Sequence, residues 1–313
     1  MQVAVTGGAG FIGANLVRRL LGDGAGVTVL DDFSTGSEAN LAGCAAVVVE
    51  GSILDPASLE RAMDGADAVV HLAARPSVPR SLEDPVASHH ANATGTLLVL
   101  EAARRAGSPQ VVLASSSSVY GGNLTLPKHE GLRPMPLSPY AASKLAAESY
   151  GLAYAHCFDL PVLALRFFNV YGPLQSSGHA YAAVVPAFVS AALGGQDLVV
   201  HGDGRQTRDF TFVGSVTSAL SAAIHGRVTS SEPVNLAFGT RASLLDVIAE
   251  LESILGRPVG RTHVAPRAGD VKDSQADDGL LRSLLPSARA VPLRDGLAET
   301  VAWSIAPDAE FFG

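Results

Sequence analysis

The stretch 2-QVAVTGGAGFIG-13 decides the fold of this chain. It starts as a short apolar run rich in β-branched residues, which is typical of a buried strand, and ends as a helix begins. Gly7, Gly10 and Gly13 stand between the two at three-residue spacing. Glycines there let the chain turn tightly and approach a pyrophosphate closely, while the helix N-terminus offers free N–H groups. The pattern predicts a dinucleotide-binding site.

A pair of aspartates ends the next apolar run, 27-VTVLDD-32. Asp31 follows Gly13 by eighteen residues, and a carboxylate at this point can accept both hydroxyls of a ribose. Asp31 and Asp32 would repel a 2′-phosphate, and no arginine follows them closely. The sequence therefore favours NAD over NADP as the dinucleotide.

Strand-like and helix-like segments alternate along the first half of the chain. The runs 67-DAVVHLAA-74 and 110-QVVLASS-116 are mostly apolar, as expected of strands buried on both faces. The alternation predicts a parallel sheet with right-handed crossovers, a doubly wound, Rossmann-type α/β fold. We expect this domain over residues 1–170 and a smaller substrate-binding α/β lobe over 171–313, with interleaved segments. Helices are expected over 11–24, 57–66, 92–106 and 182–194, and after Ser138 and Ser243.

The composition of the 313 residues is that of a globular protein, with 47% hydrophobic and 17% charged residues. The net charge of −8 gives no electrostatic reason to expect nucleic acid. Cys44 and Cys157 form no metal-binding or disulfide spacing. The first residues show neither the basic nor the long apolar segment of a signal peptide, and no run of eighteen apolar residues occurs, so we expect a soluble, cytoplasmic protein without a metal site.

A tyrosine and a lysine share one face of the helix that begins in 138-SPYAASK-144. Ser138 is a good N-cap, and Pro139 suits the first helical position. Tyr140 and Lys144 are four residues apart, so the ammonium can lie near the phenol and near a cofactor ribose. A phenol of pKa about 10 is a weak base, but Lys⁺ and a nicotinamide charge can lower that pKa by roughly three units. Tyr140 is therefore a candidate general base.

Four serines precede a tyrosine and two glycines in 114-ASSSSVYGG-122. Serine runs are usually exposed linkers. This run instead follows a buried strand directly, at the carboxyl end of the sheet, where open α/β folds bind their ligands. We interpret it as a wall of the active site.

Several motifs together resemble the extended short-chain dehydrogenase/reductase family, and more narrowly its nucleotide-sugar 4-epimerases. They are TGGAGFIG, Asp31, HLAA, the serine run before VYG, YAASK and RFFNVYGP, and the resemblance covers nearly the whole chain. It implies NAD in the first domain and a UDP-sugar held by the smaller lobe. It also implies that Tyr140, assisted by Ser116 and Lys144, takes the proton of the sugar 4-hydroxyl as carbon 4 is oxidised to a ketone. The ketone is then reduced from its other face.

The resemblance assigns further contacts by position. For the cofactor they are Gly7, Gly10, Phe11, Ile12, Gly13, Asp31, Asp32, Ser34, Gly36, Ile53, Leu72, Ala73, Ala74, Asn92, Tyr140, Lys144 and Phe167. For the UDP-sugar they are Ser77, Arg80, Ser116, Ser117, Tyr140, Asn169, Ala183, Val184, Val199, His201, Arg208, Arg267, Asp270 and Ser274. Among them, Arg208 and Arg267 match diphosphate contacts. Ser52 departs from the family pattern, since many relatives carry there an aspartate that contacts adenine.

Two hydroxyls stand where related enzymes carry acids. In sugar-nucleotide dehydratases and decarboxylases the positions of Ser117 and Ser118 tend to be acidic, which assists proton movement at carbons 5 and 6 or action on a carboxylated sugar. The serines here favour epimerisation over elimination. Tyr140 and Lys144 also disfavour a third alternative, an NAD-sensing protein without turnover, because such proteins usually lack one of the two.

Three alternatives stay open for the sugar. Ser274 matches a position that is commonly tyrosine in strict glucose/galactose epimerases, so an acetamido group would fit. The stretches 77-SVPRS-81 and 180-AYAAVVP-186 also resemble enzymes that act on UDP-GlcNAc and UDP-GalNAc, which we favour. UDP-glucose would fit as well, since a pocket rejects a smaller ligand only weakly. Arg80 would suit a uronate.

The same resemblance implies a homodimer. Its interface would be a bundle of the helix over 92–106 and the helix after Ser138. The second of these carries small and apolar residues around much of its circumference, which fits burial on two sides.

Overall fold

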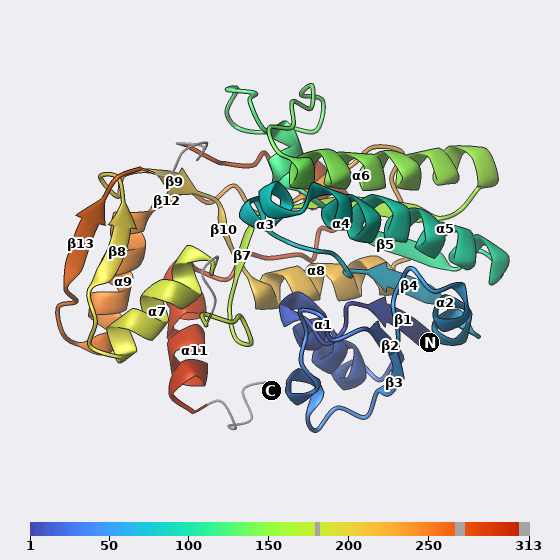
Figure 1. The fold of residues 1–313 in the computed structure, drawn as a ribbon, viewed down its shortest axis with the longest axis horizontal. Coiled ribbons are helices and arrows are strands. Elements are labelled where there is room, and N and C mark those ends of the chain that lie inside the picture. Colours follow the sequence, from blue (N-terminus) through green and yellow to red (C-terminus); the bar gives the residue numbers. More distant parts are fainter. Residues whose placement is uncertain (179–181, 267–272, 307–313) are drawn as a thin grey trace.

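The computed structural model describes residues 1–178, 182–266 and 273–306. Its centre is a seven-stranded sheet in which neighbouring strands run parallel (Figure 1). The order across the sheet is β3 (Val47–Glu50), β2 (Gly26–Asp31), β1 (Gln2–Thr6), β4 (Ala68–His71), β5 (Gln110–Ser116), β6 (Val162–Phe167) and β11 (Val234–Leu236). Strand order changes direction between β1 and β4, which confirms the predicted doubly wound α/β fold.

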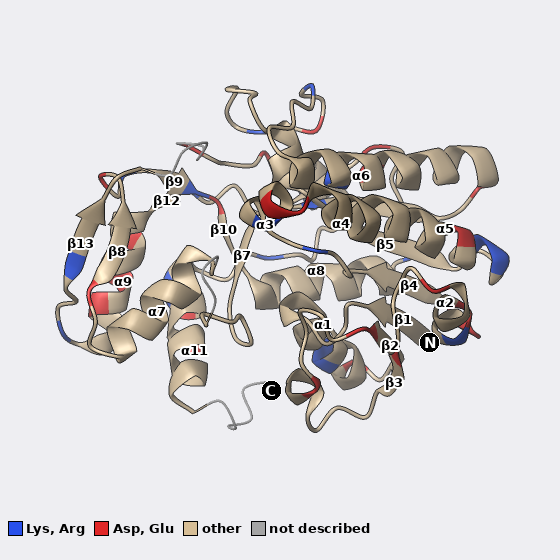
Figure 2. Cartoon of the chain, in the orientation of Figure 1, with Lys and Arg blue, Asp and Glu red and all other residues tan. Residues whose placement is uncertain are grey.

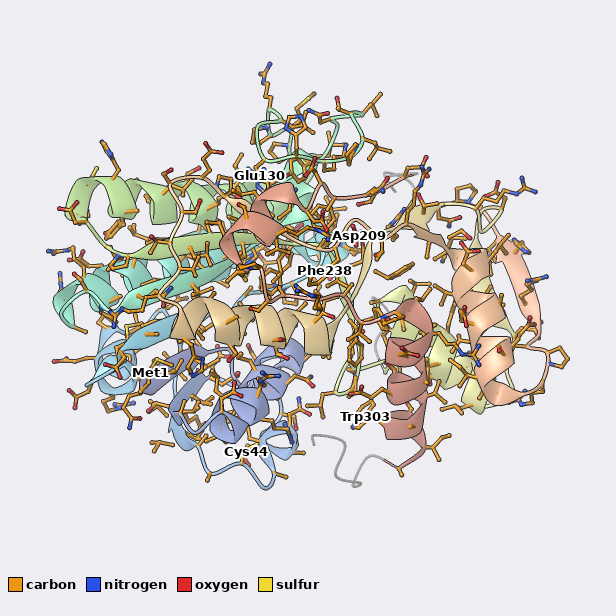
Figure 3. The ribbon with its side chains drawn as sticks, turned by 180° about the vertical axis from the view of Figure 1, so that it is seen from behind. Met1, Cys44, Glu130, Asp209, Phe238 and Trp303 are labelled. Carbon is orange, nitrogen blue, oxygen red and sulfur yellow. The ribbon has the colours of Figure 1, made fainter. Side chains whose placement is uncertain are left out.

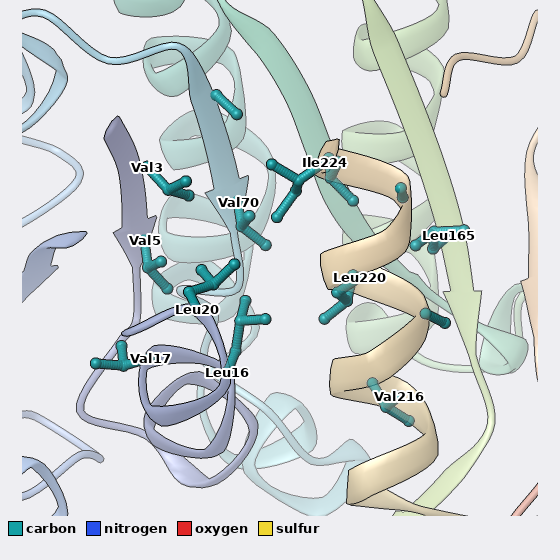
Figure 4. Packing of buried hydrophobic residues seen from close by; sticks show 14 of the residues in the cluster. Val3, Val5, Leu16, Val17, Leu20, Val70, Leu165, Val216, Leu220 and Ile224 are labelled. Atoms are coloured by element: carbon teal, nitrogen blue, oxygen red, sulfur yellow. The ribbon is translucent and has the colours of Figure 1, made fainter. Parts of the chain in front are cut away.

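Helices cover both faces of the sheet. One face carries α1 (Phe11–Gly22) and α8 (Val213–His225), and the other carries α2 (Pro56–Met63), α5 (Gly95–Arg105) and α6 (Pro139–Phe158). Apolar side chains of α1 and α8 meet those of the strands in the core (Figure 4). Because both faces are covered, the central strands are apolar on both sides, as the sequence predicted.

Side-chain caps set where two of the expected helices begin. The Ser138 hydroxyl accepts the Ala141 N–H at 3.1 Å, and α6 starts at the next residue. Ser243 and Asp246 cap α9 (Leu244–Leu255) reciprocally. The single helix predicted over 92–106 is wrong in its start, because α3 (Val78–Glu83), α4 (Pro85–His89) and a π turn (η2, His90–Thr94) precede α5.

A second, smaller lobe lies beside the sheet domain (Figure 1). Its apolar cluster is enclosed by α7 (Val184–Leu193), α9 and α11 (Leu293–Ile305), with the parallel pair β8 (Leu198–His201) and β13 (Arg261–Val264). Two more strand pairs follow the end of β6. They are β7 (Asn169–Tyr171) with β10 (Phe210–Phe212) and β9 (Thr207–Arg208) with β12 (Ala242–Ser243).

The chain passes between the two parts more than once. Although α8 and β11 come from beyond residue 170, they belong to the sheet domain, and α10 (Gly279–Leu284) adds Leu281 to the same core.

Basic residues are dispersed among acidic ones over the drawn chain (Figure 2). No helix among the described residues is long and apolar enough to cross a membrane.

Candidate active site

A cleft of about 1560 Å³ opens at the carboxyl ends of the parallel strands. Its walls come from the β1–α1 loop, the ends of β2, β4, β5 and β6, and parts of α3, α6 and α7. All predicted cofactor residues except Gly36 and Asn92 line it, as do Ser77, Arg80, Ser116 and Ala183. This edge, next to the point where strand order changes direction, is where open α/β folds bind ligands.

The glycines of the β1–α1 loop leave room for a phosphate. Gly7 has a φ of +73°, and a Cβ there would lie 2.6 Å from the backbone nitrogen of Ala73. A Cβ at Gly13 would collide with the Gly7 carbonyl oxygen, so both positions require glycine. At Gly10 a Cβ would meet only that carbonyl, at 3.3 Å, and no side chain caps the first N–H groups of α1. An open approach to an uncapped helix N-terminus fits a dinucleotide pyrophosphate.

Asp31 links the end of β2 to the glycine loop. Its Oδ2 accepts the Ala9 N–H at 2.8 Å, and its Oδ1 accepts the Phe33 N–H at 2.9 Å. Burial raises the pKa of Asp31, and these hydrogen bonds oppose the rise. A carboxylate has about four acceptor sites, so two are left for ribose hydroxyls. Asp32 beside it accepts both the N–H and the hydroxyl of Ser34.

Gly36 and Asn92 lie behind the cleft wall. A Cβ at Gly36 would lie 2.8 Å from the backbone carbonyl carbon of Ala9. The Asn92 side chain accepts the Arg75 N–H at 2.7 Å and donates to the Arg75 carbonyl at 3.2 Å and to the Ser143 hydroxyl at 3.0 Å. Asn92 thus fixes the loop after β4 to α6. It can influence a bound cofactor only indirectly, by holding that loop in position.

Two serines and a tyrosine meet where β5 ends. The hydroxyl of Ser118, in the 3-10 turn η3 (Ser117–Tyr120), donates to Ser116 Oγ at 2.9 Å. Ser116 hydrogen-bonds the phenol of Tyr140 at the start of α6. Burial raises the pKa of Tyr140, and the hydrogen bond from Ser116 partly offsets that rise. The phenol therefore ends a chain of two hydroxyls, along which a proton can move.

Lys144 lies one helical turn after Tyr140. It is 5% exposed, and its Nζ donates to the Ala114 carbonyl at 2.8 Å. Burial lowers the pKa of Lys144 to about 8, so the ammonium is still the main form at neutral pH. The sequence predicted that this charge lowers the pKa of the Tyr140 phenol. In the structure the effect of burial on the phenol is larger, because the ammonium is directed to Ala114.

Ser77 and Arg80 line the cleft at the start of α3. Ser77 has a φ of +93°, and its Oγ is buried without a hydrogen-bond partner among the described residues. An unpaired buried hydroxyl costs about 1–3 kcal/mol, and such strain is typical of ligand sites. The Arg80 guanidinium likewise has no ion-pair or hydrogen-bond partner within the described chain.

Three predicted substrate residues gather in a second group around β7, β9 and β10. The Ser274 N–H donates to the Thr207 carbonyl at 3.0 Å, next to Arg208, and the Asn169 N–H donates to the Asp209 carbonyl at 3.3 Å. This group does not line the cleft; neither do Ser117, Val184, Val199 and His201. Arg267 and Asp270 lie outside the described residues.

Several cleft residues were not predicted from the sequence. Thr300, Trp303 and Ser304 reach the cleft from α11, and Figure 3 labels Trp303, the single tryptophan. Gln175 donates through Nε2 to the Val170 carbonyl at 3.2 Å, while its Oε1 is buried without a partner among the described residues. A helix near the C-terminus can be expected from sequence, but its place beside the cleft depends on tertiary packing.

Comparison with known proteins agrees with this geometry. The chain matches the model of the NAD dependent epimerase/dehydratase family over residues 3–237. It is 38% identical over 308 residues to the UDP-glucose 4-epimerase of Mycolicibacterium smegmatis, which covers 96% of this chain and 97% of that protein. Other relatives are UDP-glucuronate 4-epimerases and a dTDP-glucose 4,6-dehydratase.

Two solved structures share nearly the whole fold. One is the UDP-N-acetylglucosamine 4-epimerase of Methanobrevibacter ruminantium M1 in complex with UDP-N-acetylmuramic acid, with a TM-score of 0.92, 34% identity and 98% of each chain covered. The other is the UDP-glucose 4-epimerase of Thermotoga maritima with UDP-glucose, with a TM-score of 0.92, 33% identity and 98% and 99% coverage. The chain therefore belongs to the NAD-dependent epimerase/dehydratase family, and NAD is its cofactor.

Proposed function

We propose that the protein interconverts the two epimers at carbon 4 of a UDP-hexose through a 4-keto intermediate. The observation that carries this proposal is the hydroxyl chain from Ser118 through Ser116 to Tyr140, with Lys144 one turn away. NAD bound in the cleft supplies the oxidation and the later reduction at carbon 4. Ser116 stabilises the Tyr140 phenolate by donating a hydrogen bond, and this phenolate accepts the proton of the 4-hydroxyl and becomes the neutral phenol. The same phenol returns the proton to the new hydroxyl.

The absence of an acid on the serine wall supports epimerisation over elimination. Among the described residues, the carboxylates that line the cleft are Asp31, Asp32 and Glu83, which belong to the end of β2 and to α3. The end of β5 lines the cleft with Ser115 and Ser116 instead. Loss of water from a 4-keto sugar requires a proton to be moved at carbons 5 and 6. A serine hydroxyl is a poor acid or base for that step.

Among UDP-hexoses we infer that the N-acetylhexosamine pair is the substrate. Ser274, whose N–H bonds the carbonyl of Thr207 next to Arg208, is a small residue and would not obstruct an acetamido group. The unpaired Ser77 hydroxyl offers a hydrogen-bonding group on the cleft wall. The likeness to a UDP-N-acetylglucosamine 4-epimerase supports this choice, and the likeness to UDP-glucose 4-epimerases supports UDP-glucose as the alternative.

One observation favours UDP-glucuronate as a second candidate. The Arg80 guanidinium faces the cleft without a partner among the described residues, and a carboxylate at carbon 6 would pair with it. Arg80→Leu separates the candidates. It should leave the turnover of UDP-GlcNAc nearly unchanged, whereas it should lower kcat/KM for UDP-glucuronate by at least tenfold if that is the substrate.

The deciding experiment is incubation with UDP-GlcNAc, UDP-glucose and UDP-glucuronate without added reductant, followed by chromatography and mass measurement. We expect a product of unchanged mass, with the highest kcat/KM for UDP-GlcNAc. Tyr140→Phe should lose about 10²–10⁴-fold in kcat while keeping NAD, since it lacks only the ionisable hydroxyl. A product lighter by one water would indicate a dehydratase. No product from any of the three would overturn the proposal.

We also propose that α5 and α6 form the interface of a homodimer. The faces of α6 turned away from the sheet carry Tyr150 and Phe158 at 41% and 48% exposure. A helix that is apolar around its circumference fits burial on both sides. Sedimentation should give a dimer at micromolar concentration, and Ala153→Arg on the exposed face of α6 should give a monomer. Ala42→Arg, in an exposed loop, is the matched control and should stay dimeric.

A further inference from the structure

A row of buried polar side chains crosses three neighbouring strands below the serine wall. Arg166 on β6 is paired in register with Ser115 on β5 and with Asn235 on β11, so the three side chains point to one face of the sheet. Their exposures are 2% for Arg166, 2% for Ser115 and 0% for Asn235. Polar groups this deep are kept only where hydrogen bonds satisfy them.

Glu148 of α6 closes one end of this row. Its Oε2 accepts the Ser115 hydroxyl at 2.6 Å and the Arg166 Nε at 2.9 Å, and its Oε1 accepts Nη2 of Arg166 at 2.7 Å. The carboxylate is 3% exposed and the guanidinium 2%. Glu148 follows Tyr140 by two helical turns and Lys144 by one, on the same side of α6. The ion pair therefore fixes the helix that carries the phenol to the strand end that carries the serines.

The other end of the row holds the turn that contains Ser118. The Arg166 guanidinium lies over the Tyr120 ring, 4.7 Å from its centroid, and the Tyr120 hydroxyl donates to Asn235 Oδ1 at 2.6 Å. Tyr120 is the last residue of η3. The Arg166 guanidinium thus contacts both Glu148 of α6 and Tyr120 of η3. Glu148 and Arg166 themselves do not line the cleft.

We propose that Glu148 and Arg166 are positioning residues that hold the Tyr140 phenol against the hydroxyls of Ser116 and Ser118. This rests on the proposed function. The phenol comes from a helix and the hydroxyls come from a strand end and a turn, so their hydrogen bonds need these three elements to keep one relative position. Such a constellation tolerates shifts of only about 0.5 Å. Loss of the ion pair lets α6 shift along the sheet and lengthens the bond between Ser116 and Tyr140.

The main test is the double variant Glu148→Leu/Arg166→Met. Replacing both partners avoids leaving one buried charge unpaired, and similar side-chain volume keeps the core filled. We expect a folded protein that retains NAD, with KM for the UDP-sugar within about twofold, kcat at least tenfold lower and the alkaline shift of the kcat–pH profile that follows loss of the Ser116 donor. Unchanged kcat and an unchanged pH profile in the folded variant would show a purely structural ion pair and overturn the proposal.

A second variant and a readout without turnover complete the test. Arg166→Lys keeps the charge but loses the bidentate bond, so it should also lower kcat while leaving KM nearly unchanged. The phenol titration at 295 nm, taken as wild type minus Tyr140→Phe, should shift to higher pH when measured in the double-variant background. A wild type inactive on every UDP-sugar would refute the proposed function, and an unshifted titration would refute the positioning role. Ser283→Ala, on the exposed side of α10, is the control and should behave as wild type.

Discussion

Two serine hydroxyls act in sequence on the Tyr140 phenol. Ser118 donates to Ser116, and Ser116 in turn lowers the pKa of the phenol by hydrogen-bonding it. A phenolate benefits from such donors more than a neutral phenol does. The two serines thus favour the form of Tyr140 that can act as a base, and they do so without a competing negative charge.

Ser118→Ala tests this chain of hydroxyls. The substitution removes one donor to Ser116 Oγ, a contact of 2.9 Å, and such a bond contributes about 0.5–1.5 kcal/mol. We expect kcat to fall about 2- to 13-fold with NAD content and KM unchanged, measured by steady-state kinetics on the substrate identified above. Ser283→Ala is again the control. Full kcat in Ser118→Ala would mean that Ser116 needs no support.

The residues with a local signature were predictable from sequence. Tyr140 and Lys144 share a helix face, and the serine run follows a strand, so their spacing alone brings them to one edge. The bond between Ser118 and Ser116 was not predictable, because the sequence suggested only that Ser116 assists Tyr140 and that Ser118 stands where relatives carry an acid. Gln175 and Trp303 were missed for a different reason: each reaches the cleft through contacts between distant segments.

At the scale of elements, the β1–α1 unit shows how strictly a loop and a helix are fitted. A Cβ at Gly13 would collide with the Gly7 carbonyl, whereas a Cβ at Gly22, at the other end of α1, would have nothing within 4 Å. The N-terminus of α1 is packed against the β1–α1 loop, whereas no atoms are packed against Gly22 at the C-terminus of α1. Replacement of glycine by alanine should therefore disturb the structure at Gly13, whereas it should be tolerated at Gly22.

Gly13→Ala should separate α1 from the loop and weaken NAD binding by at least tenfold, measured by calorimetric titration of protein freed of cofactor. Gly22→Ala should bind NAD normally and gain about 0.5–1 kcal/mol in free energy of unfolding, since alanine loses less entropy in a helix. Normal NAD binding by folded Gly13→Ala would contradict the close fit seen here.

Elements were predictable where burial left a clear pattern. β1, β2, β4 and β5 are apolar on both faces and were found from sequence. β3 was missed although its run of valines resembles a buried strand, and in the structure it is an edge strand with Val47 and Val48 64% and 46% exposed. The sequence did not show that α8 and β11 belong to the sheet domain, because their place depends on contacts with residues far away in the sequence.

At the scale of the molecule, one buried carboxylate joins the sheet domain to the smaller lobe. Asp209, just before β10, accepts the Thr240 hydroxyl at 2.8 Å, the Ala276 N–H at 3.1 Å and backbone N–H groups of Phe238 and Gly239. Figure 3 labels Asp209 and Phe238 where the sheet domain meets the smaller lobe. One fully buried carboxylate thus gathers three segments of chain, and its burial raises its pKa to about 6.

His71 and Asp209 should give the stability of the molecule opposite responses to acid. Burial lowers the pKa of His71 to about 3, where it bridges the hydroxyls of Thr6 and Thr96 at 2.7 and 2.9 Å. Below pH 6.5 the unfolded chain binds a proton at His71 that the folded chain does not, so stability falls with pH. Below pH 6 the folded chain binds a proton at Asp209 that the unfolded chain does not, so that contribution rises.

Urea unfolding at pH 7 and pH 5, at one saturating NAD concentration, should resolve the two contributions. Relative to wild type, His71→Asn should gain about 2 kcal/mol on going from pH 7 to pH 5, because the destabilising protonation of unfolded His71 is gone. Asp209→Asn should lose about 1 kcal/mol over the same interval, because the folded state no longer takes up its proton. Parallel pH dependences of wild type and His71→Asn would mean that His71 is charged in the folded protein, and the neutral bridge between Thr6 and Thr96 would be wrong.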